Sequence, residues 1–279
     1  MNALGCLING VPNDVVLVSD RGLQYGDGLF ETIAVRDGAP CLWRRHMQRL
    51  LRGCRILDLQ LPPVDRLLDE CLSLTRGHDA AVLKIILTRG GGGRGYTPPA
   101  DPTPVRILSL HPSTDYPPTW RNDGITVTLC SMPSSENRKL AGLKHLNRLD
   151  QVLARKELSA DGYVEGLMCD SRERIIGGTM TNLFLWNGDT LTTPRLDTCG
   201  IAGTVRALVL EEAQHSGCPV RISDIRLVEI ERARGMFLTN AVVGVWPVRR
   251  FLDTNFNVHR LPASLLKSVR RQTHQPEMK

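Results

Sequence analysis

Residues 138–153 carry the strongest structural signal in this chain: Arg138-Lys-Leu-Ala-Gly-Leu-Lys144-His-Leu-Asn-Arg-Leu-Asp-Gln-Val-Leu153. Lysine is scarce in the sequence, with six lysines among 35 basic residues, so each one invites a chemical explanation. Lys144 follows a small, apolar approach, and apolar surroundings lower the pKa of a lysine and free its amine for Schiff-base chemistry. The plain alternative is a lysine that extends from a helix end toward water.

The residues after Lys144 predict an amphipathic helix. Leu146, Leu149, Val152 and Leu153 repeat at helical spacing, so we expect the helix to begin near Lys144 and to lie on a core.

Composition and charge limit the class of protein. A chain of 279 residues with 42% hydrophobic content can form one large domain or two. It has no apolar run of 18 residues, so we expect no transmembrane helix and no membrane partner. The first positive charge is Arg21, which argues against a signal peptide. The net charge of +6 is carried mainly by arginine, which favours an anionic small ligand over nucleic acid.

Eight cysteines are scattered without a C-x-x-C pair, as expected of reduced thiols in a cytoplasmic protein. No histidine pair has metal-ligand spacing, so we expect no metal site.

The order of predicted elements indicates an α+β protein, because strands and helices do not alternate regularly. A proline-rich segment at 111–120 resembles an interdomain linker and suggests domains at 1–115 and 116–279. The expected strands are 4–8, 14–18, 29–35, 81–88, 105–110, 125–130, 163–169, 175–186, 190–193 and 237–248. The expected helices begin near Arg45, Lys144, Gly203 and Pro262.

Two segments could bind anions. The glycine-rich loop 89–96 ends in Arg94-Gly-Tyr96, a donor pair suited to a carboxylate, although a mobile connection is the plain reading. Gly200-Ile-Ala-Gly203-Thr204-Val205 leads into a helix whose first amides and dipole favour an anion, although a simple turn and cap would look the same. By spacing alone Arg49 belongs to the solvated face of its helix.

Taken together, these segments resemble the class IV pyridoxal-phosphate aminotransferase family, and most closely its 4-amino-4-deoxychorismate lyase branch. The residues that carry the resemblance are Ser19-Asp-Arg-Gly-Leu-Gln-Tyr25-Gly-Asp-Gly-Leu-Phe30-Glu-Thr, His46-Met-Gln-Arg49-Leu, Thr88-Arg-Gly-Gly-Gly-Gly-Arg94-Gly-Tyr96, Gly142-Leu-Lys144-His-Leu-Asn147-Arg148-Leu, and Thr193-Pro-Arg-Leu-Asp197 with Gly200-Ile-Ala-Gly203. It implies a fold-type IV enzyme with a smaller N-terminal and a larger C-terminal domain, pyridoxal 5'-phosphate between them, and a homodimer.

The resemblance also assigns roles. Lys144 would bind the cofactor as a Schiff base and move the proton, with Thr32 as an auxiliary hydroxyl. The cofactor phosphate would be held by Arg49, by Gly203, Thr204 and Val205, and by a group near Asn240. The substrate would meet Tyr25, Phe30, Arg94 and Tyr96. The implied reaction converts 4-amino-4-deoxychorismate to 4-aminobenzoate and pyruvate, a step of folate biosynthesis.

One position departs from the family pattern. A glutamate that would pair with the pyridine nitrogen of the cofactor is replaced by Gly177, and no acidic residue lies between Arg174 and Trp186. A pyridinium without its carboxylate is a weaker electron sink. A water or a threonine hydroxyl is the alternative partner. We expect the lyase to tolerate this change better than a transaminase, because formation of an aromatic product drives its reaction.

Three alternatives remain at this stage. One is an aminotransferase for D- or branched-chain amino acids with the same fold; Ala34, where branched-chain relatives tend to have arginine, argues against it. The second is a non-catalytic binding protein that retains the fold. The third is an arginine-rich protein that binds nucleic acid.

Overall fold

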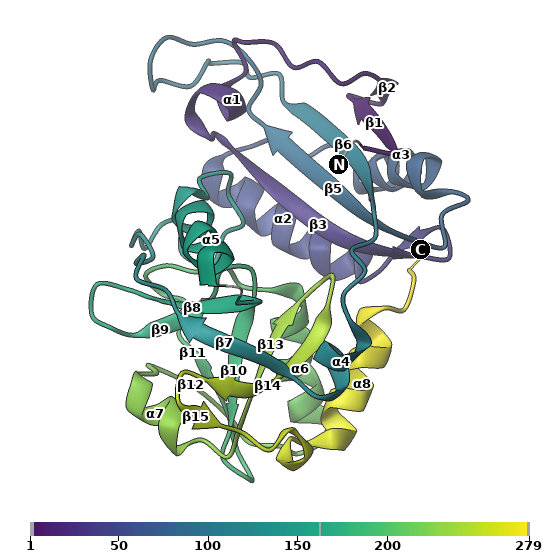
Figure 1. The fold of residues 1–279 in the computed structure, drawn as a ribbon. Coiled ribbons are helices and arrows are strands. Elements are labelled where there is room, and N and C mark those ends of the chain that lie inside the picture. The colour runs from purple at the N-terminus through teal and green to yellow at the C-terminus, as the bar shows by residue number, and fades with distance from the viewer. Residues whose placement is uncertain (1–2, 162, 278–279) are drawn as a thin grey trace. The chain divides into compact units, whose positions relative to one another are not determined.

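The computed structural model describes residues 3–161 and 163–277, and the chain falls into two compact units (Figure 1). Unit 1 contains the chain up to Thr114, Leu143–Asn147, and the residues from His274 onward. Unit 2 contains Asp115–Gly142 and Arg148–Thr273. This contact-based division groups Lys144 with unit 1, whereas the sequence suggested one boundary near residue 115, and that boundary stays a prediction.

Unit 1 is an antiparallel sheet with helices on one face (Figure 1). Its strand order is β2-β1-β6-β5-β3-β4. The elements are β1 (Gly5–Ile8), β2 (Val11–Pro12), α1 (Arg21–Tyr25), β3 (Gly28–Arg36), β4 (Ala39–Pro40), α2 (Trp43–Leu57), α3 (Val64–Thr75), β5 (Ala80–Thr88) and β6 (Val105–Pro112).

Alternation along β3 determines which side chains face the helices. Leu29, Ile33 and Val35 are buried in the same core cluster as Leu50 of α2 and Leu67 of α3. The intervening residues of β3 point to the opposite face, because successive side chains of a strand alternate. The sheet therefore separates an apolar core from a face that is available for chemistry.

Unit 2 is built on a mixed sheet. Its order is β12-β11-β10-β13-β14-β7-β8-β9, with β15 paired to β14. The elements are α4 (Pro118–Asn122), β7 (Ile125–Leu129), α5 (Leu149–Asp161), β8 (Glu165–Cys169), β9 (Ile175–Gly178), β10 (Asn182–Trp186), β11 (Leu191–Pro194), α6 (Thr204–His215), β12 (Val220–Ser223), α7 (Leu227–Arg232), β13 (Gly235–Asn240), β14 (Gly244–Phe251), β15 (Thr254–Asn255), the 3-10 turn η1 (Val258–Arg260) and α8 (Ala263–Thr273). Both units combine helices with sheets that are not regularly alternating βαβ units, which confirms the α+β class.

Two predicted strands are wrong in part. Residues 14–18 form no strand, and β1 pairs instead with the short β2 and with β6. The single strand expected over 175–186 is divided at 179–181. The Met180 amide donates to the Glu165 carboxylate at 3.3 Å, and the Thr179 amide is shared between that carboxylate and the Gly166 carbonyl of β8, both at 3.0 Å.

The helix expected from Lys144 begins only at Leu149, and its apolar stripe does not lie on a core. Leu149, Val152 and Leu153 are 76%, 59% and 48% exposed, whereas Ala154 and Leu158 of the same helix are buried. The expectation of a core-facing stripe is therefore wrong for the chain by itself.

Among the described residues, no helix combines the length and apolar character needed to cross a membrane.

Candidate active site

Lys144 lies in an extended segment that is hydrogen-bonded to strand β3 within unit 1. The Phe30 amide donates to the Lys144 carbonyl at 2.9 Å, and the Leu146 amide donates to the Gly28 carbonyl at 3.1 Å. These bonds place Lys144 Nζ 4.1 Å from the centroid of the Phe30 ring. At this distance an ammonium group is attracted to the ring face. The structure thus brings together two of the predicted site residues.

Two glycines in the segment 19–32 allow the Lys144 segment to lie close to β3. A Cβ at Gly28 would lie 2.5 Å from the Leu87 carbonyl oxygen and 2.8 Å from Leu146 Cδ1. Gly26 has φ +66°, and a Cβ there would lie 2.5 Å from Asn147 Oδ1. A side chain at either position would push the lysine segment away from the strand.

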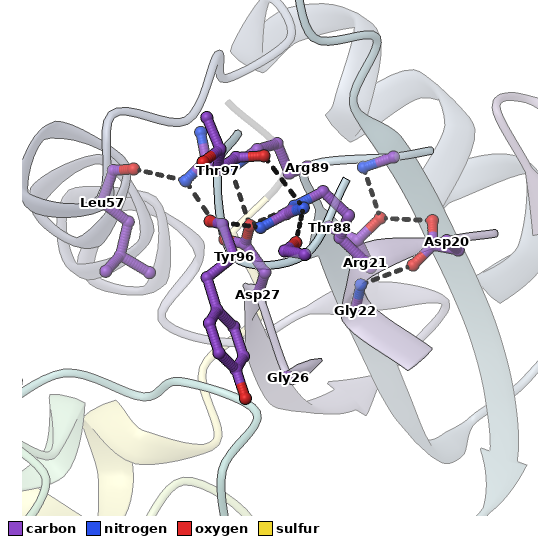
Figure 2. A network of polar contacts seen from close by, with 12 residues as sticks. Asp20, Arg21, Gly22, Gly26, Asp27, Leu57, Thr88, Arg89, Tyr96 and Thr97 are labelled. Carbon is purple, nitrogen blue, oxygen red and sulfur yellow. Dashed lines mark hydrogen bonds and ion pairs between the residues drawn. The ribbon is translucent and has the colours of Figure 1, made fainter. Parts of the chain in front are cut away.

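Other residues of the segment 19–32 form a polar network with the end of β5 (Figure 2). Asp20 accepts from the Gly22 amide at 2.8 Å at the start of α1, and from Thr88 Oγ1 at 2.7 Å. Asp27 accepts from Arg21 Nε at 3.0 Å and from Arg89 Nε at 2.8 Å. Burial raises the pKa of Asp27, but the hydrogen bonds from both arginines outweigh it and lower the pKa below its usual value.

Arg21 also fixes the glycine-rich loop. Its guanidinium donates to the carbonyl oxygens of Gly95, Tyr96 and Thr97 at 3.0, 3.0 and 3.3 Å (Figure 2). The backbone of this loop is therefore held by a buried cation, although its side chains are exposed.

The predicted substrate-binding residues of unit 1 are brought together only in part. The Tyr25 and Tyr96 rings meet edge-on, with centroids 5.5 Å apart, and Tyr96 is 86% exposed. Arg94 is exposed and makes no hydrogen bond or ion pair with the residues that the structure describes. Its role in substrate binding stays a prediction.

Lys84 is a second cation beside Phe30 that sequence reasoning did not select. It pairs with Thr32 across β3 and β5, so both side chains share the sheet face of Phe30. Lys84 Nζ lies 5.6 Å from the centroid of the Phe30 ring, and no carboxylate of the described residues pairs with it. The available signal was a lysine within the otherwise apolar run 81–88.

Behind this face, Arg49 is anchored by a buried carboxylate. Glu31 is 1% exposed and accepts from Arg49 Nε at 2.9 Å and from His46 Nδ1 at 2.6 Å. Burial opposes ionisation of Glu31, but the charges and hydrogen bonds of Arg49 and His46 outweigh it and lower the pKa of Glu31 to about 2. Burial also lowers the pKa of His46, against the attraction of Glu31. The Arg49 side chain is 12% exposed, so the solvated position expected from helix spacing is wrong.

In unit 2, the start of α6 fits a phosphate group. Gly203 is the N-cap and provides no side-chain hydrogen bond to the first amides of the helix. Thr204 Oγ1 is buried and has no hydrogen-bond partner among the described residues. Val205 is buried behind it. The free amides and the dipole of a helix start favour an anion, and the Thr204 hydroxyl adds a donor.

The adjoining strand β13 supplies another unpartnered hydroxyl. Thr239 pairs with Asn182 across β10 and β13, is fully buried, and its Oγ1 has no partner among the described residues. Asn240 Oδ1 instead accepts from the Val242 and Val243 amides, both at 2.9 Å, and closes a turn. The Thr239 hydroxyl thus lacks a partner among the described residues, whereas Asn240 Oδ1 is already engaged. The sequence Thr239-Asn240 alone could not show this difference.

Close packing around Asn182 shapes the same cradle. A Cβ at Gly203 would lie 2.0 Å from Asn182 Oδ1, and Asn182 Nδ2 donates to the Ile201 carbonyl at 2.8 Å. The glycine is required because any side chain would displace this amide.

Gly177, the position that departs from the family pattern, lies at the end of β9. Its φ is +156°, and a Cβ there would lie 2.8 Å from the Thr181 carbonyl oxygen. The backbone around residue 177 is thus adapted to glycine.

Glu165 is a nearby carboxylate that sequence reasoning missed. It is fully buried and accepts from Thr179 Oγ1 and, at 3.0 Å, from Thr181 Oγ1. With the Thr179 and Met180 amides, these bonds occupy its oxygens and hold the segment between β9 and β10. Its role here is to shape this segment.

The chain is similar to known proteins over most of its length. A family model described as amino-transferase class IV matches residues 28–251. The chain belongs to the class IV aminotransferase family.

Several similar proteins are named as aminodeoxychorismate lyases, and two of them cover most of this chain. The aminodeoxychorismate lyase of Vibrio harveyi is 33% identical over 241 residues, which cover 86% of this chain and 89% of that protein. The crystal structure of 4-amino-4-deoxychorismate lyase from Pseudomonas aeruginosa is 44% identical, with a TM-score of 0.91 and coverage of 95% of this chain and 98% of the other. A putative branched-chain-amino-acid aminotransferase of Methanocaldococcus jannaschii is 28% identical and covers 84% of this chain and 81% of that protein. The two lyases match more closely than this aminotransferase does.

Proposed function

We propose that this family member is a pyridoxal-phosphate-dependent lyase that converts 4-amino-4-deoxychorismate to 4-aminobenzoate and pyruvate in folate biosynthesis. The likeness to the two lyases over most of the chain supports it. The structural observation that carries the proposal is the placement of Lys144 Nζ over the Phe30 ring, because this lysine must reach both cofactor and substrate.

Each unit, taken by itself, offers groups suited to the cofactor. Lys144 would be its covalent anchor, and Arg49, whose guanidinium is held in place by Glu31, would contribute a cation to the phosphate. Gly203, Thr204 and Val205 at the start of α6, with Thr239 beside Asn240, would hold the phosphate. The unpartnered buried hydroxyls of Thr204 and Thr239 support this assignment.

When bound, pyridoxal phosphate withdraws electrons from the amine-bearing carbon of the substrate. Lys144 Nζ would take the proton from that ring carbon. The bond from the adjacent carbon to oxygen then breaks, and pyruvate leaves as its enol with a proton supplied by Lys144 or by the Thr32 hydroxyl. Thr32 lies on the sheet face of Phe30, which supports this auxiliary role.

The substrate carries two carboxylates, and unit 1 offers cations for them. Lys84 shares the Phe30 face and has no acidic partner among the described residues. Arg94, Tyr96 and Tyr25 would complete the substrate contacts, at the loop whose backbone Arg21 holds.

Gly177 favours the lyase over a transaminase. A transaminase must stabilise a carbanion and protonate it elsewhere, which depends on a protonated pyridine ring. Loss of the substrate's enolpyruvyl group instead yields an aromatic ring, so the demand on the pyridine nitrogen is lower. A water or a threonine hydroxyl would then be sufficient as its partner.

The test is incubation of the cofactor-loaded protein with aminodeoxychorismate while pyruvate and 4-aminobenzoate are measured. An amino-acid and keto-acid pair serves as the control reaction. We expect equal amounts of both products, and loss of this activity and of the visible cofactor band in Lys144→Ala. Faster transamination than lyase turnover would establish the aminotransferase alternative, and the absence of a cofactor band would establish the non-catalytic one.

We further propose that the protein acts as a cytoplasmic homodimer. The exposed stripe of Leu149, Val152 and Leu153 on α5 supports self-association, because exposed apolar patches mark interfaces. The cysteines form no disulfide, which fits a reducing compartment. Leu153→Glu should shift the protein from dimer to monomer in size-exclusion chromatography with light scattering. A monomeric wild-type protein would contradict the proposal.

A further inference from the structure

Unit 2 contains a polar pocket on the sheet face opposite α6. The hydroxyl of Thr193 accepts from Arg206 Nε of α6 at 3.2 Å. Thr192, the preceding residue of β11, must therefore point to the other face of the sheet, because strand side chains alternate. A pocket of about 460 Å³ opens on that face, with Thr192 in its wall. It is thus separated by the sheet from the helix whose start we assign to the cofactor phosphate.

The pocket wall is a row of side chains across neighbouring strands, closed by α7. Leu185 of β10 pairs with Thr192 of β11, which pairs with Arg221 of β12, so the three side chains share one face. The complete lining is Leu185, Asn187, Thr192, Arg221, Ser223, Asp224, Glu229, Arg232 and Arg234.

The charge balance of this lining favours an anion. Arg221, Arg232 and Arg234 make no side-chain hydrogen bond or ion pair with any residue that the structure describes. The two carboxylates of the lining are already engaged. Asp224 pairs with Arg174 and Arg195 at 3.2 and 3.8 Å, neither of which lines the pocket.

Glu229, the other carboxylate, accepts from the Arg226 amide at 2.8 Å at the start of α7. The pocket is therefore lined by three arginines that have no acid committed to them.

A second observation comes from the wall of the pocket. Thr192 is 2% exposed, and its Oγ1 is buried without a hydrogen-bond partner among the described residues. A buried hydroxyl without a partner costs free energy unless a ligand satisfies it. The hydroxyl can donate one hydrogen bond to an anion that enters the pocket.

We propose that this pocket binds a small polyanion of the class of phosphorylated metabolites. Guanidinium groups match phosphoryl oxygens in geometry as well as in charge. The volume is far larger than one phosphate requires and lies in the range of small-molecule sites. The site is distinct from the proposed cofactor cradle and does not depend on the proposed reaction.

The test is isothermal titration of the protein, previously saturated with pyridoxal phosphate, with pyrophosphate as the probe. We expect saturable binding with one site per chain. Arg221→Ala and Arg234→Ala should each weaken it by about tenfold, the effect of losing one charge-assisted hydrogen bond. The Arg249→Ala/Arg250→Ala double variant, which removes two exposed arginines of β14 elsewhere, should bind as the wild type does.

Two further titrations test the buried hydroxyl and the class of ligand. Thr192→Val keeps the side-chain shape and should weaken pyrophosphate binding several-fold. Its thermal unfolding midpoint is measured alongside to show that the variant is folded. Malonate should bind more weakly than pyrophosphate. The proposal is overturned if binding does not saturate, if the Arg249→Ala/Arg250→Ala control loses as much affinity as Arg221→Ala and Arg234→Ala, or if malonate binds more tightly. Cofactor loading and lyase turnover, measured on the same variants, report separately on the proposed function.

Discussion

Replacing Glu31 by glutamine tests the electrostatic anchor of Arg49. The carboxylate is 1% exposed and is held by Arg49 and His46. Its pKa falls from the ordinary 4.5 to about 2 in the folded chain. At about 1.4 kcal/mol per pKa unit, this shift corresponds to roughly 3 kcal/mol of folding free energy at pH 7. Glu31→Gln keeps the shape but removes the charge, so we expect the free energy of unfolding to fall by about 3 kcal/mol.

The sign of the pH dependence follows from the lowered pKa. The folded state binds the Glu31 proton less tightly than the unfolded state does, so the stabilisation is fully present above pH 4.5. It is lost as the pH falls from there toward 2. The difference in stability between wild type and Glu31→Gln should therefore be constant near neutral pH and should decrease below pH 4.5.

The assay is urea unfolding followed by circular dichroism, on cofactor-free protein, at several pH values from about 7 down to about 3, within the range where the Glu31 contribution is lost. Glu173→Gln is the control. Glu173 lies 3.7 Å from Arg226 and its side chain is 90% exposed, so removal of its charge should cost about 1 kcal/mol or less. A loss below about 1 kcal/mol for Glu31→Gln, or a difference that grows as the pH falls, would refute the reasoning.

Three further changes probe the site. Gly28→Ala should lower the free energy of unfolding by about 1–3 kcal/mol in urea titrations, because its methyl group would meet the Leu87 carbonyl; an unchanged midpoint would contradict the close approach. Gly177→Glu should increase transamination relative to lyase turnover and should also cost roughly 1–3 kcal/mol of stability, because residue 177 is adapted to glycine. We expect the wild type to transaminate weakly. If it transaminates strongly and Gly177→Glu leaves that rate unchanged, then the formation of an aromatic product does not explain why Gly177 is tolerated. Lys84→Met should raise KM for the dicarboxylate substrate by about tenfold with little change in kcat and an intact cofactor band; an unchanged KM would remove Lys84 from the substrate site.

Local sequence patterns predicted the core strands and helices well where one physical signal dominates. The apolar run 81–88 became β5 (Ala80–Thr88), and the glycine-led helix became α6 (Thr204–His215). The start of α5 was predicted five residues too early, because the segment around Lys144 makes its hydrogen bonds to β3 instead of closing helical turns. Such tertiary hydrogen bonds have no signature in local spacing.

In the candidate site, too, the sequence identifies only those residues that a local signal marks. Lys144 and the start of α6 could be chosen from the sequence because small residues and glycines mark them. Lys84, Thr239 and Glu165 could not, since their importance comes from strand register and from which polar atoms have partners. Arg49 was selected only through the family resemblance, because helix spacing cannot reveal a buried acid on the adjacent strand.

Arg21 binds residues 95–97 only through their main-chain carbonyl oxygens. The backbone of the loop and its side chains can therefore evolve under separate constraints. Because no side chain of the loop takes part in these hydrogen bonds, they do not depend on the side chains of Arg94 and Tyr96, which we propose contact the substrate. In such an arrangement, substitutions at exposed loop positions can change which substrate is bound, and the fold that holds the loop need not change.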